Sequence, residues 1–186
     1  MTDARRAVFL DRDGTLNIER DLVRTPEDLE LIPGAIDALK MLAAAGYALV
    51  VVTNQSARAR GLLSEAELDA VHDSLRASLL EASVELTDIV YCPHHPTAGE
   101  PPLRAECACR KPEPGLIHSA AERHQLDLSR SWIVGDAARD MEAGRRAGVQ
   151  TLLVETGKGS GERSAFDPKM VVKDIKAAAE RIIAQG

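Results

Sequence analysis

The sequence predicts an α/β fold, with a Rossmann-like parallel sheet that carries helices on both faces. Three observations support this prediction. Short apolar runs alternate along the chain with segments of helical periodicity, which is the order expected of parallel strands joined by crossover helices. The runs are apolar throughout, as in strands that are covered on both faces. Several runs end directly on small polar or acidic residues, which is typical of the carboxyl edge of such a sheet.

Five strands and five helices are predicted, in alternation. The apolar runs place the strands at residues 7–10, 48–52, 88–92, 131–136 and 151–154. Pro33-Gly34 opens a helix that ends before Gly46, and a capping box from Ser64 to Glu67 begins the next one. Further helices are predicted from Pro114, over 139–147 and over 171–183. The glycine-rich segment 156–161 lacks the G-x-G-x-x-G spacing of a phosphate-binding loop, so we expect a flexible loop there.

The composition is ordinary for a globular protein, and the length of 186 residues predicts a single domain over 1–186. A net charge of -6 disfavours nucleic-acid binding, which needs a basic surface. No apolar run approaches the roughly 18 residues of a membrane span, and Arg5-Arg6 precedes too short an apolar stretch for a signal peptide. We therefore expect a cytoplasmic monomer that acts on a small molecule, with no nucleic-acid or membrane partner.

Carboxylates follow the first and the fourth predicted strands. Asp11 and Asp13 come directly after the first strand, and Asp136 ends the fourth. Because the carboxyl ends of parallel strands share one edge of the sheet, we expect these side chains to meet there with Thr53 from the second strand. Carboxylates without a cluster of histidine or cysteine suit Mg²⁺. Lys111, just before a predicted helix, is the candidate cation for a phosphoryl group.

A second metal site is predicted in the long connection after the third strand. Twelve residues separate a C-x-H motif, Cys92-Pro93-His94, from a C-x-C motif, Cys107-Ala108-Cys109. Three thiolates and one imidazole match a closed, structural zinc site, and His95 is an alternative to His94. We expect zinc to hold together a loop within 92–109 and to place Arg110-Lys111 over the strand ends. The other histidines are expected on helix surfaces: His72, His118 and His124.

The motifs together resemble those of the haloacid-dehalogenase phosphatases. In chain order they are Asp11-Arg12-Asp13-Gly14-Thr15, Thr53-Asn54, Lys111, and Gly135-Asp136 with Asp140. The resemblance implies the haloacid-dehalogenase fold without a large cap domain. It also implies that Asp11 attacks phosphorus to form an aspartyl-phosphate, while Asp13 protonates the leaving oxygen and then activates water. Mg²⁺ on Asp11, Asp13 and Asp136 would neutralise the phosphoryl oxygens together with Thr53 and Lys111, and Asp140 would orient these ligands.

Over nearly the whole chain the sequence is similar to two narrower families, the D-glycero-D-manno-heptose 1,7-bisphosphate 7-phosphatases and the histidinol-phosphate phosphatases. The similarity is carried by Thr53-Asn54-Gln55-Ser56, Cys92-Pro93-His94-His95-Pro96 and Cys109-Arg110-Lys111-Pro112. The long spacer before Cys107 favours the heptose enzymes, with histidinol phosphate as the alternative substrate. The resemblance implies substrate contacts at Asn54, Ser56, Arg110 and Glu19. The chain departs from the pattern of the heptose enzymes at Asp21-Leu22, Ala57 and Ala137. We expect these departures to affect substrate binding rather than the phosphoryl chemistry.

Three other functions stay open on the sequence alone. A receiver-like phosphoacceptor, which is not an enzyme, also combines clustered carboxylates, a threonine, a lysine and magnesium on a parallel sheet. In a zinc-stapled binding module the carboxylates would be incidental, solvated acids. A DNA 3′-phosphatase would share the chemistry, but the acidic net charge weighs against it.

Overall fold

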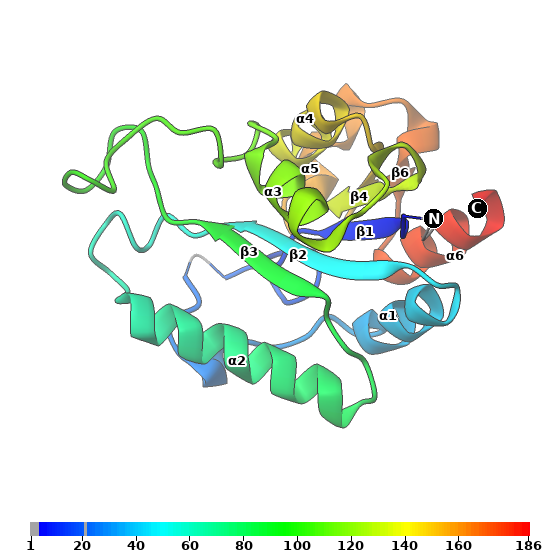
Figure 1. Cartoon of the computed structure of the whole chain (residues 1–186), viewed down its shortest axis with the longest axis horizontal. Coiled ribbons are helices and arrows are strands. Elements are labelled where there is room, and N and C mark those ends of the chain that lie inside the picture. The colour runs from blue at the N-terminus through cyan, green and yellow to red at the C-terminus, as the bar shows by residue number, and fades with distance from the viewer. Residues whose placement is uncertain (1–3, 21) are drawn as a thin grey trace.

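The computed structural model describes residues 4–20 and 22–186, and its strands form one parallel sheet (Figure 1). The strands are β1 (Ala7–Leu10), β2 (Ala48–Asn54), β3 (Asp88–Cys92), β4 (Trp132–Gly135), β5 (Gln150–Val154) and β6 (Val171–Val172). Their order across the sheet is β3-β2-β1-β4-β5-β6, and every neighbouring pair is parallel. This arrangement confirms the predicted fold class and contains each predicted strand.

Helices cover both faces of the sheet, as predicted (Figure 1). They are α1 (Ala35–Ala44), α2 (Glu65–Glu81), α3 (Gly115–His124), α4 (Ala138–Ala147), α5 (Gly159–Glu162) and α6 (Ile175–Gln185). Side chains of α1, α2 and α6 pack on one face, and those of α3 and α4 pack on the other. Among the described residues, no helix has both the length and the apolar character needed to cross a membrane.

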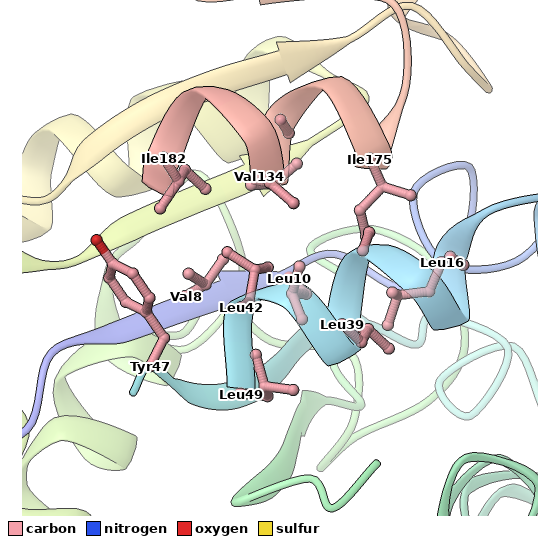
Figure 2. Packing of buried hydrophobic residues seen from close by; sticks show 14 of the residues in the cluster. Val8, Leu10, Leu16, Leu39, Leu42, Tyr47, Leu49, Val134, Ile175 and Ile182 are labelled. Atoms are coloured by element: carbon pink, nitrogen blue, oxygen red, sulfur yellow. The ribbon is translucent and has the colours of Figure 1, made fainter. Parts of the chain in front are cut away.

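Alternate side chains of β1 enter two different hydrophobic cores. Val8 and Leu10 join the core beneath α1 and α6, whereas Ala7 and Phe9 join the core beneath α3 and α4. Figure 2 shows the first of these cores, in which residues from β1, α1 and α6 meet. Because all four strand residues are completely buried, β1 is fixed from both sides, and the residues after it inherit a fixed position.

The C-terminal segment differs from the predicted helix over 171–183. Val171 and Val172 instead form β6, which pairs with the end of β5. The helix begins only after Asp174, whose side chain accepts a hydrogen bond of 2.9 Å from the N–H of Ala177. The two β-branched valines favour a strand, and an aspartate favours a helix N-cap. These local preferences place the start of the helix after Asp174, although the helical spacing of apolar residues continues back to Val172.

The segment 156–161, which we expected to be a flexible loop, includes the first three residues of the short helix α5 and is hydrogen-bonded to the rest of the fold. The hydroxyl of Thr156 donates to the carbonyl oxygen of Gly14 at 2.6 Å. A Cβ atom at Gly157 would lie only 2.2 Å from Oδ2 of Asp136, so glycine is required for this close approach. The glycines therefore allow the segment to pack against the carboxyl edge of the sheet.

The strand order places a crevice at the carboxyl ends of β1 and β4. After β1 the chain continues on one side of the sheet through β2 and β3, and it then returns to the other side of β1 as β4. Such a reversal of strand order opens a crevice at the carboxyl edge, where ligands bind in open α/β sheets. Asp11 follows β1 and Asp136 follows β4, so the topology places both residues at this crevice.

Adjacent leucines of α2 allow a direct test of this packing. Leu79 is completely buried in the core beneath α1, whereas 64% of Leu80 is exposed. We predict that Leu79→Ala lowers the free energy of unfolding by about 2–4 kcal/mol, because it leaves a cavity. Leu80→Ala should change this free energy by less than about 0.5 kcal/mol. Urea unfolding measures both, and equal effects of the two substitutions would contradict the placement of α2.

Candidate active site

Three buried carboxylates meet in the crevice. Asp11 and Asp136 follow β1 and β4, and Asp140 lies in the first turn of α4. One oxygen of each carboxylate lies within 4.8 Å of the others. The N–H of Lys158 donates to Oδ2 of Asp136 at 2.9 Å, while Oδ1 of Asp136 is buried and has no hydrogen-bond partner among the described residues. This free, buried oxygen is available to a ligand.

The ammonium of Lys111 lies against two of these carboxylates. Its Nζ atom is 2.7 Å from Oδ1 of Asp11 and 2.7 Å from Oδ1 of Asp140, and it donates to the carbonyl oxygen of Val52 at 2.7 Å. Asn54 fixes the backbone of Lys111 through two hydrogen bonds of 3.0 Å, one donated and one accepted. The expected cation is therefore buried at the site, and Asn54, which we expected to bind substrate, holds this lysine in place.

The charges in this cluster do not balance. Burial raises the pKa of Asp11 to about 7, with further upward contributions from Asp140 and Asp136, while Lys111 acts in the opposite direction. Burial also raises the pKa of Asp136 to about 6. Three carboxylates face the ammonium of Lys111 and the guanidinium of Arg139, which leaves a net negative charge, so an added cation would stabilise the ionised carboxylates. Closely spaced carboxylate oxygens, one of them without a partner, fit a divalent ion such as Mg²⁺.

The carboxylate of Asp13 lies outside this cluster. Strand β1 ends at Leu10, and the chain bends at Arg12, whose carbonyl oxygen accepts a hydrogen bond of 2.9 Å from the N–H of Leu16, so Asp11 and Asp13 do not lie on one extended strand. Asp13 accepts hydrogen bonds from the side chains of Arg12, Asn17 and Gln55.

Burial acts to raise the pKa of Asp13, but the charge of Arg12 and the hydrogen bonds from Asn17 and Gln55 outweigh it and lower this pKa. The Asp13 carboxylate is therefore favoured in its ionised form in this arrangement. Its expected contact with Mg²⁺ stays a prediction.

The expected substrate-binding residues line one cavity of about 130 Å³ next to Asp13. Its walls include Glu19, Asn54, Ser56 and Arg110. Thr53 lies behind this surface and is 1% exposed, and its hydroxyl accepts a hydrogen bond of 2.9 Å from Gln55. Gln55 also donates to Oδ2 of Asp13 at 3.0 Å. The structure thus brings the expected residues to one place, with Gln55 as a link that the sequence analysis did not single out.

The four expected zinc ligands also come together. The sulfur atoms of Cys92, Cys107 and Cys109 are separated by 3.1–3.5 Å, and Nδ1 of His94 is 3.4 Å from Cys109 and 3.6 Å from Cys92. His95 points elsewhere, since its Nδ1 accepts a hydrogen bond of 2.9 Å from the N–H of Ala98. Three cysteine sulfurs and one imidazole nitrogen around a common centre fit zinc.

Comparisons with known proteins agree with this geometry. A HAD-hydrolase-like (haloacid-dehalogenase-like) family model matches residues 108–178. A Pseudomonas putida protein named D-glycero-beta-D-manno-heptose-1,7-bisphosphate 7-phosphatase is 40% identical over 181 residues, which cover 96% of this chain and 99% of that protein. A Salmonella typhi protein of the same name is 46% identical over 153 residues, covering 82% of this chain and 81% of that protein. The chain belongs to this family of phosphatases.

A solved member of the family has the same fold. The crystal structure of D,D-heptose 1,7-bisphosphate phosphatase from B. bronchiseptica, complexed with magnesium and phosphate, superposes with a TM-score of 0.86 at 36% identity. The match covers 97% of this chain and 99% of that one. The haloacid-dehalogenase fold is thereby confirmed, and the described residues contain no large cap domain. Membership of a phosphatase family over this length also sets aside the binding module and the receiver-like phosphoacceptor.

Several residues at the site of this phosphatase were missed in the sequence analysis. Arg139 and Lys158 line the cavity, and Nε of Arg139 is buried without a partner among the described residues. His72, expected on a helix surface, is in fact 5% exposed and contacts Arg12. Its spacing of four residues from Leu68 and three from Leu75 is a helical signal for this burial that the sequence analysis did not use. Of the departures from the heptose pattern, Asp21 lies outside the described residues, Leu22 lines the cavity, and Ala57 and Ala137 are buried.

Adjacent histidines test the zinc site. We predict that the wild-type protein and His95→Gln are purified with stoichiometric zinc, whereas His94→Gln loses most of it because the imidazole at the cluster is gone. Elemental analysis after gel filtration measures the metal content. Loss of phosphatase activity should accompany loss of zinc, since Arg110 and Lys111 follow directly after Cys109. Retention of stoichiometric zinc by His94→Gln, or its loss from His95→Gln, would contradict this assignment.

The burial of His72 predicts a dependence of stability on pH. Burial, assisted by the charge of Arg12, lowers the pKa of His72 from its usual 6.5 to about 3. Below pH 6.5 the unfolded chain gains a proton at this residue that the folded chain does not, so the free energy of unfolding falls as the pH drops towards 3. The loss relative to His72→Gln should approach about 1.4 kcal/mol per pH unit. Urea unfolding between pH 7 and pH 4 measures it, and parallel curves for the two proteins would refute the prediction.

Proposed function

We propose that this chain is a magnesium-dependent phosphatase that removes the 7-phosphate of D-glycero-β-D-manno-heptose 1,7-bisphosphate through an aspartyl-phosphate on Asp11. The observation that carries the proposal is the ion pair of 2.7 Å between Asp11 and the buried ammonium of Lys111, within a cluster of carboxylates. An ionised carboxylate beside a fixed cation is suited to attack a phosphoryl group whose charge the same cation neutralises. The names of the relatives from Pseudomonas putida and Salmonella typhi support the substrate.

Asp11 attacks phosphorus in the first step, and the bond from phosphorus to the sugar oxygen O7 breaks. Lys111 holds Asp11 in place and neutralises the transferring group, with Thr53 as a nearby hydroxyl donor. When bound, Mg²⁺ supplies further charge neutralisation. Asp11 and Asp136 are the residues that would hold it, with Asp13 as the expected third ligand.

Asp13 acts as the acid and then as the base. It gives a proton to O7 as the first step proceeds, and it takes a proton from the water that attacks phosphorus in the second step, which frees Asp11 and inorganic phosphate. The hydrogen bonds to Asp13 favour its ionised form, which is the form required of the base. The negative phosphoryl group acts in the opposite direction when it lies nearby, and so favours protonation for the first step.

The cavity beside Asp13 suits a substrate with a second phosphate. Arg110, directly after the zinc loop, and Arg139 of α4 line it, and Lys158 adds a third positive charge. Guanidinium groups bind phosphate oxygens well, and we assign the phosphate at C1 to them. Glu19 and Ser56 can hydrogen-bond to sugar hydroxyls in the same cavity. Histidinol phosphate is the weaker candidate because its amino group would face these cations.

We also propose that the enzyme acts as a cytoplasmic, single-domain monomer. The large apolar side chains that are exposed among the described residues come from four different segments: Ile18, Leu62, Leu80 and Ile183. A dispersed pattern of this kind is typical of a surface that is not built for association. The cysteines gather around one point rather than forming disulfides, which suits a reducing compartment.

Magnesium-dependent phosphate release tests the substrate. The two anomers of heptose 1,7-bisphosphate and histidinol phosphate are compared at matched concentrations, with kcat/KM as the measure. We expect the highest value for the β anomer of the heptose. A higher value for histidinol phosphate would overturn the proposed substrate, and a higher value for the α anomer would overturn its proposed configuration.

Substitutions of two buried residues test the chemistry. We predict that Asp11→Asn abolishes turnover, since an amide does not replace the nucleophilic carboxylate. Lys111→Met should lower kcat by about 100-fold or more, because it removes the charge next to the transferring group. Lys176→Met, at an exposed lysine of α6, is the control and should retain wild-type kcat. Normal magnesium-dependent turnover by Asp11→Asn would eliminate the mechanism.

A further inference from the structure

Arg12 is a buried arginine that the mechanism above does not use directly. It is 1% exposed and lies between Asp11 and Asp13 in the chain. Its Nε atom donates to Oδ1 of Asp13 at 3.2 Å, and its Nη2 atom donates to Oδ1 at 3.0 Å and to Oδ2 at 2.9 Å. A guanidinium that contacts both oxygens fixes the plane of a carboxylate as well as its position.

The third nitrogen of Arg12 points to helix α2. Its Nη1 atom lies 3.1 Å from Nε2 of His72. Arginine can only donate hydrogen bonds, so Nε2 of His72 is the acceptor, and the imidazole is neutral with its proton on Nδ1. The low pKa of His72, caused by burial and by the charge of Arg12, agrees with this form of the ring.

His72 is itself held firmly. Its ring packs against that of Tyr91 on β3, with centroids 5.4 Å apart and the planes at 52°. Helix α2, which carries His72, begins at a capping box in which the side chains and N–H groups of Ser64 and Glu67 bond reciprocally. Within the described part of the chain, Arg12 therefore forms side-chain hydrogen bonds with two groups, Asp13 on one side and His72 on the other.

The remaining partners of Asp13 do not replace this arrangement. Asn17 donates one hydrogen bond to Oδ1, and Gln55 donates one to Oδ2, each from a separate side chain. Loss of the acceptor on His72 would leave a buried N–H of Arg12 without a partner, which is costly enough to rotate the guanidinium. Such a rotation would also turn the carboxylate that Arg12 holds.

We propose that His72 is a positioning residue for the phosphatase reaction: it fixes Arg12, and Arg12 holds the Asp13 carboxylate where the leaving oxygen is protonated. This inference rests on the proposed function, in which Asp13 is the acid and base. The network runs from α2 through the interior to the reacting group, and it gives a role to the buried pair His72 and Arg12.

The test compares His72→Met with His72→Gln. The two new side chains are similar in length, but only glutamine has an oxygen that accepts a hydrogen bond well. Each variant is assayed with heptose 1,7-bisphosphate, whose sugar oxygen needs a proton to leave, and with p-nitrophenyl phosphate, whose nitrophenolate leaves without one. The value of kcat/KM reports the steps up to the release of this leaving group.

We expect His72→Met to lower kcat/KM about tenfold on the bisphosphate, a loss typical of impaired acid catalysis, and less than twofold on p-nitrophenyl phosphate. His72→Gln should restore most of the loss. His118→Met, at an exposed histidine of α3, is the control and should behave as the wild type on both substrates. Equal losses on the two substrates, or an equal loss in the Met and Gln variants, would overturn the proposal.

A second measurement needs no variant of His72. Nitrogen NMR of the folded wild-type protein should show a neutral His72 with its proton on Nδ1 throughout pH 5–8, and a proton on Nε2 would overturn the network. Failure of the proposed substrate is distinguishable, because the wild type would then release no phosphate from either heptose anomer. In that case an alkyl phosphate that the wild type does hydrolyse would replace the heptose bisphosphate in the comparison with p-nitrophenyl phosphate.

Discussion

The ammonium of Lys111 joins parts of the chain that lie far apart in the sequence. Its contacts with Asp11, Asp140 and the carbonyl oxygen of Val52 connect the segment after the zinc loop to β1, α4 and β2. A buried ammonium is stable only when such partners surround it, and each carboxylate in turn depends on the cation. The position of Lys111 therefore depends on the loop that precedes it, so we expect zinc binding in that loop to affect the chemistry. Asn54 completes this connection by fixing the backbone of Lys111.

The excess negative charge of the carboxylate cluster is the feature that favours binding of a cation here. Lys111 and Arg139 together do not neutralise three carboxylates, and burial, with the mutual repulsion of these carboxylates, raises the pKa values of Asp11 and Asp136. A divalent cation and a phosphoryl group together restore the balance, since the cation offsets the carboxylates and the phosphoryl oxygens meet the positive groups. Asp13 lies apart, held by its own hydrogen bonds. This separation suits two carboxylates with different tasks, one that attacks and one that moves protons.

The sequence predicted the parts of the site that follow from periodicity and topology. Parallel strands that end on Asp11, Thr53 and Asp136 had to bring these residues to one edge, and the spacing of the cysteines indicated the zinc cluster. The bend at Arg12, which separates Asp13 from Asp11, depends on backbone geometry that an alternating strand pattern does not contain. His72 lies at helical spacing from the buried Leu68 and Leu75, so periodicity could have indicated its burial, whereas its partner Arg12 lies 60 positions away in the chain and cannot be found from α2 alone. Strand β6 is only two residues long, and its residues were predicted as part of the last helix because Val172 continues the helical spacing of apolar residues.

The central claim is that the reaction passes through a phosphate ester on Asp11. Its most direct test is a rapid acid quench of wild-type enzyme during a single turnover of substrate that carries ³²P in the 7-phosphate, followed by peptide mapping. The account predicts a transient label on the peptide that contains Asp11, which rises before inorganic phosphate does and is released by hydroxylamine. Formation of labelled inorganic phosphate with no protein-bound label at any time, or a label on another residue, would contradict it.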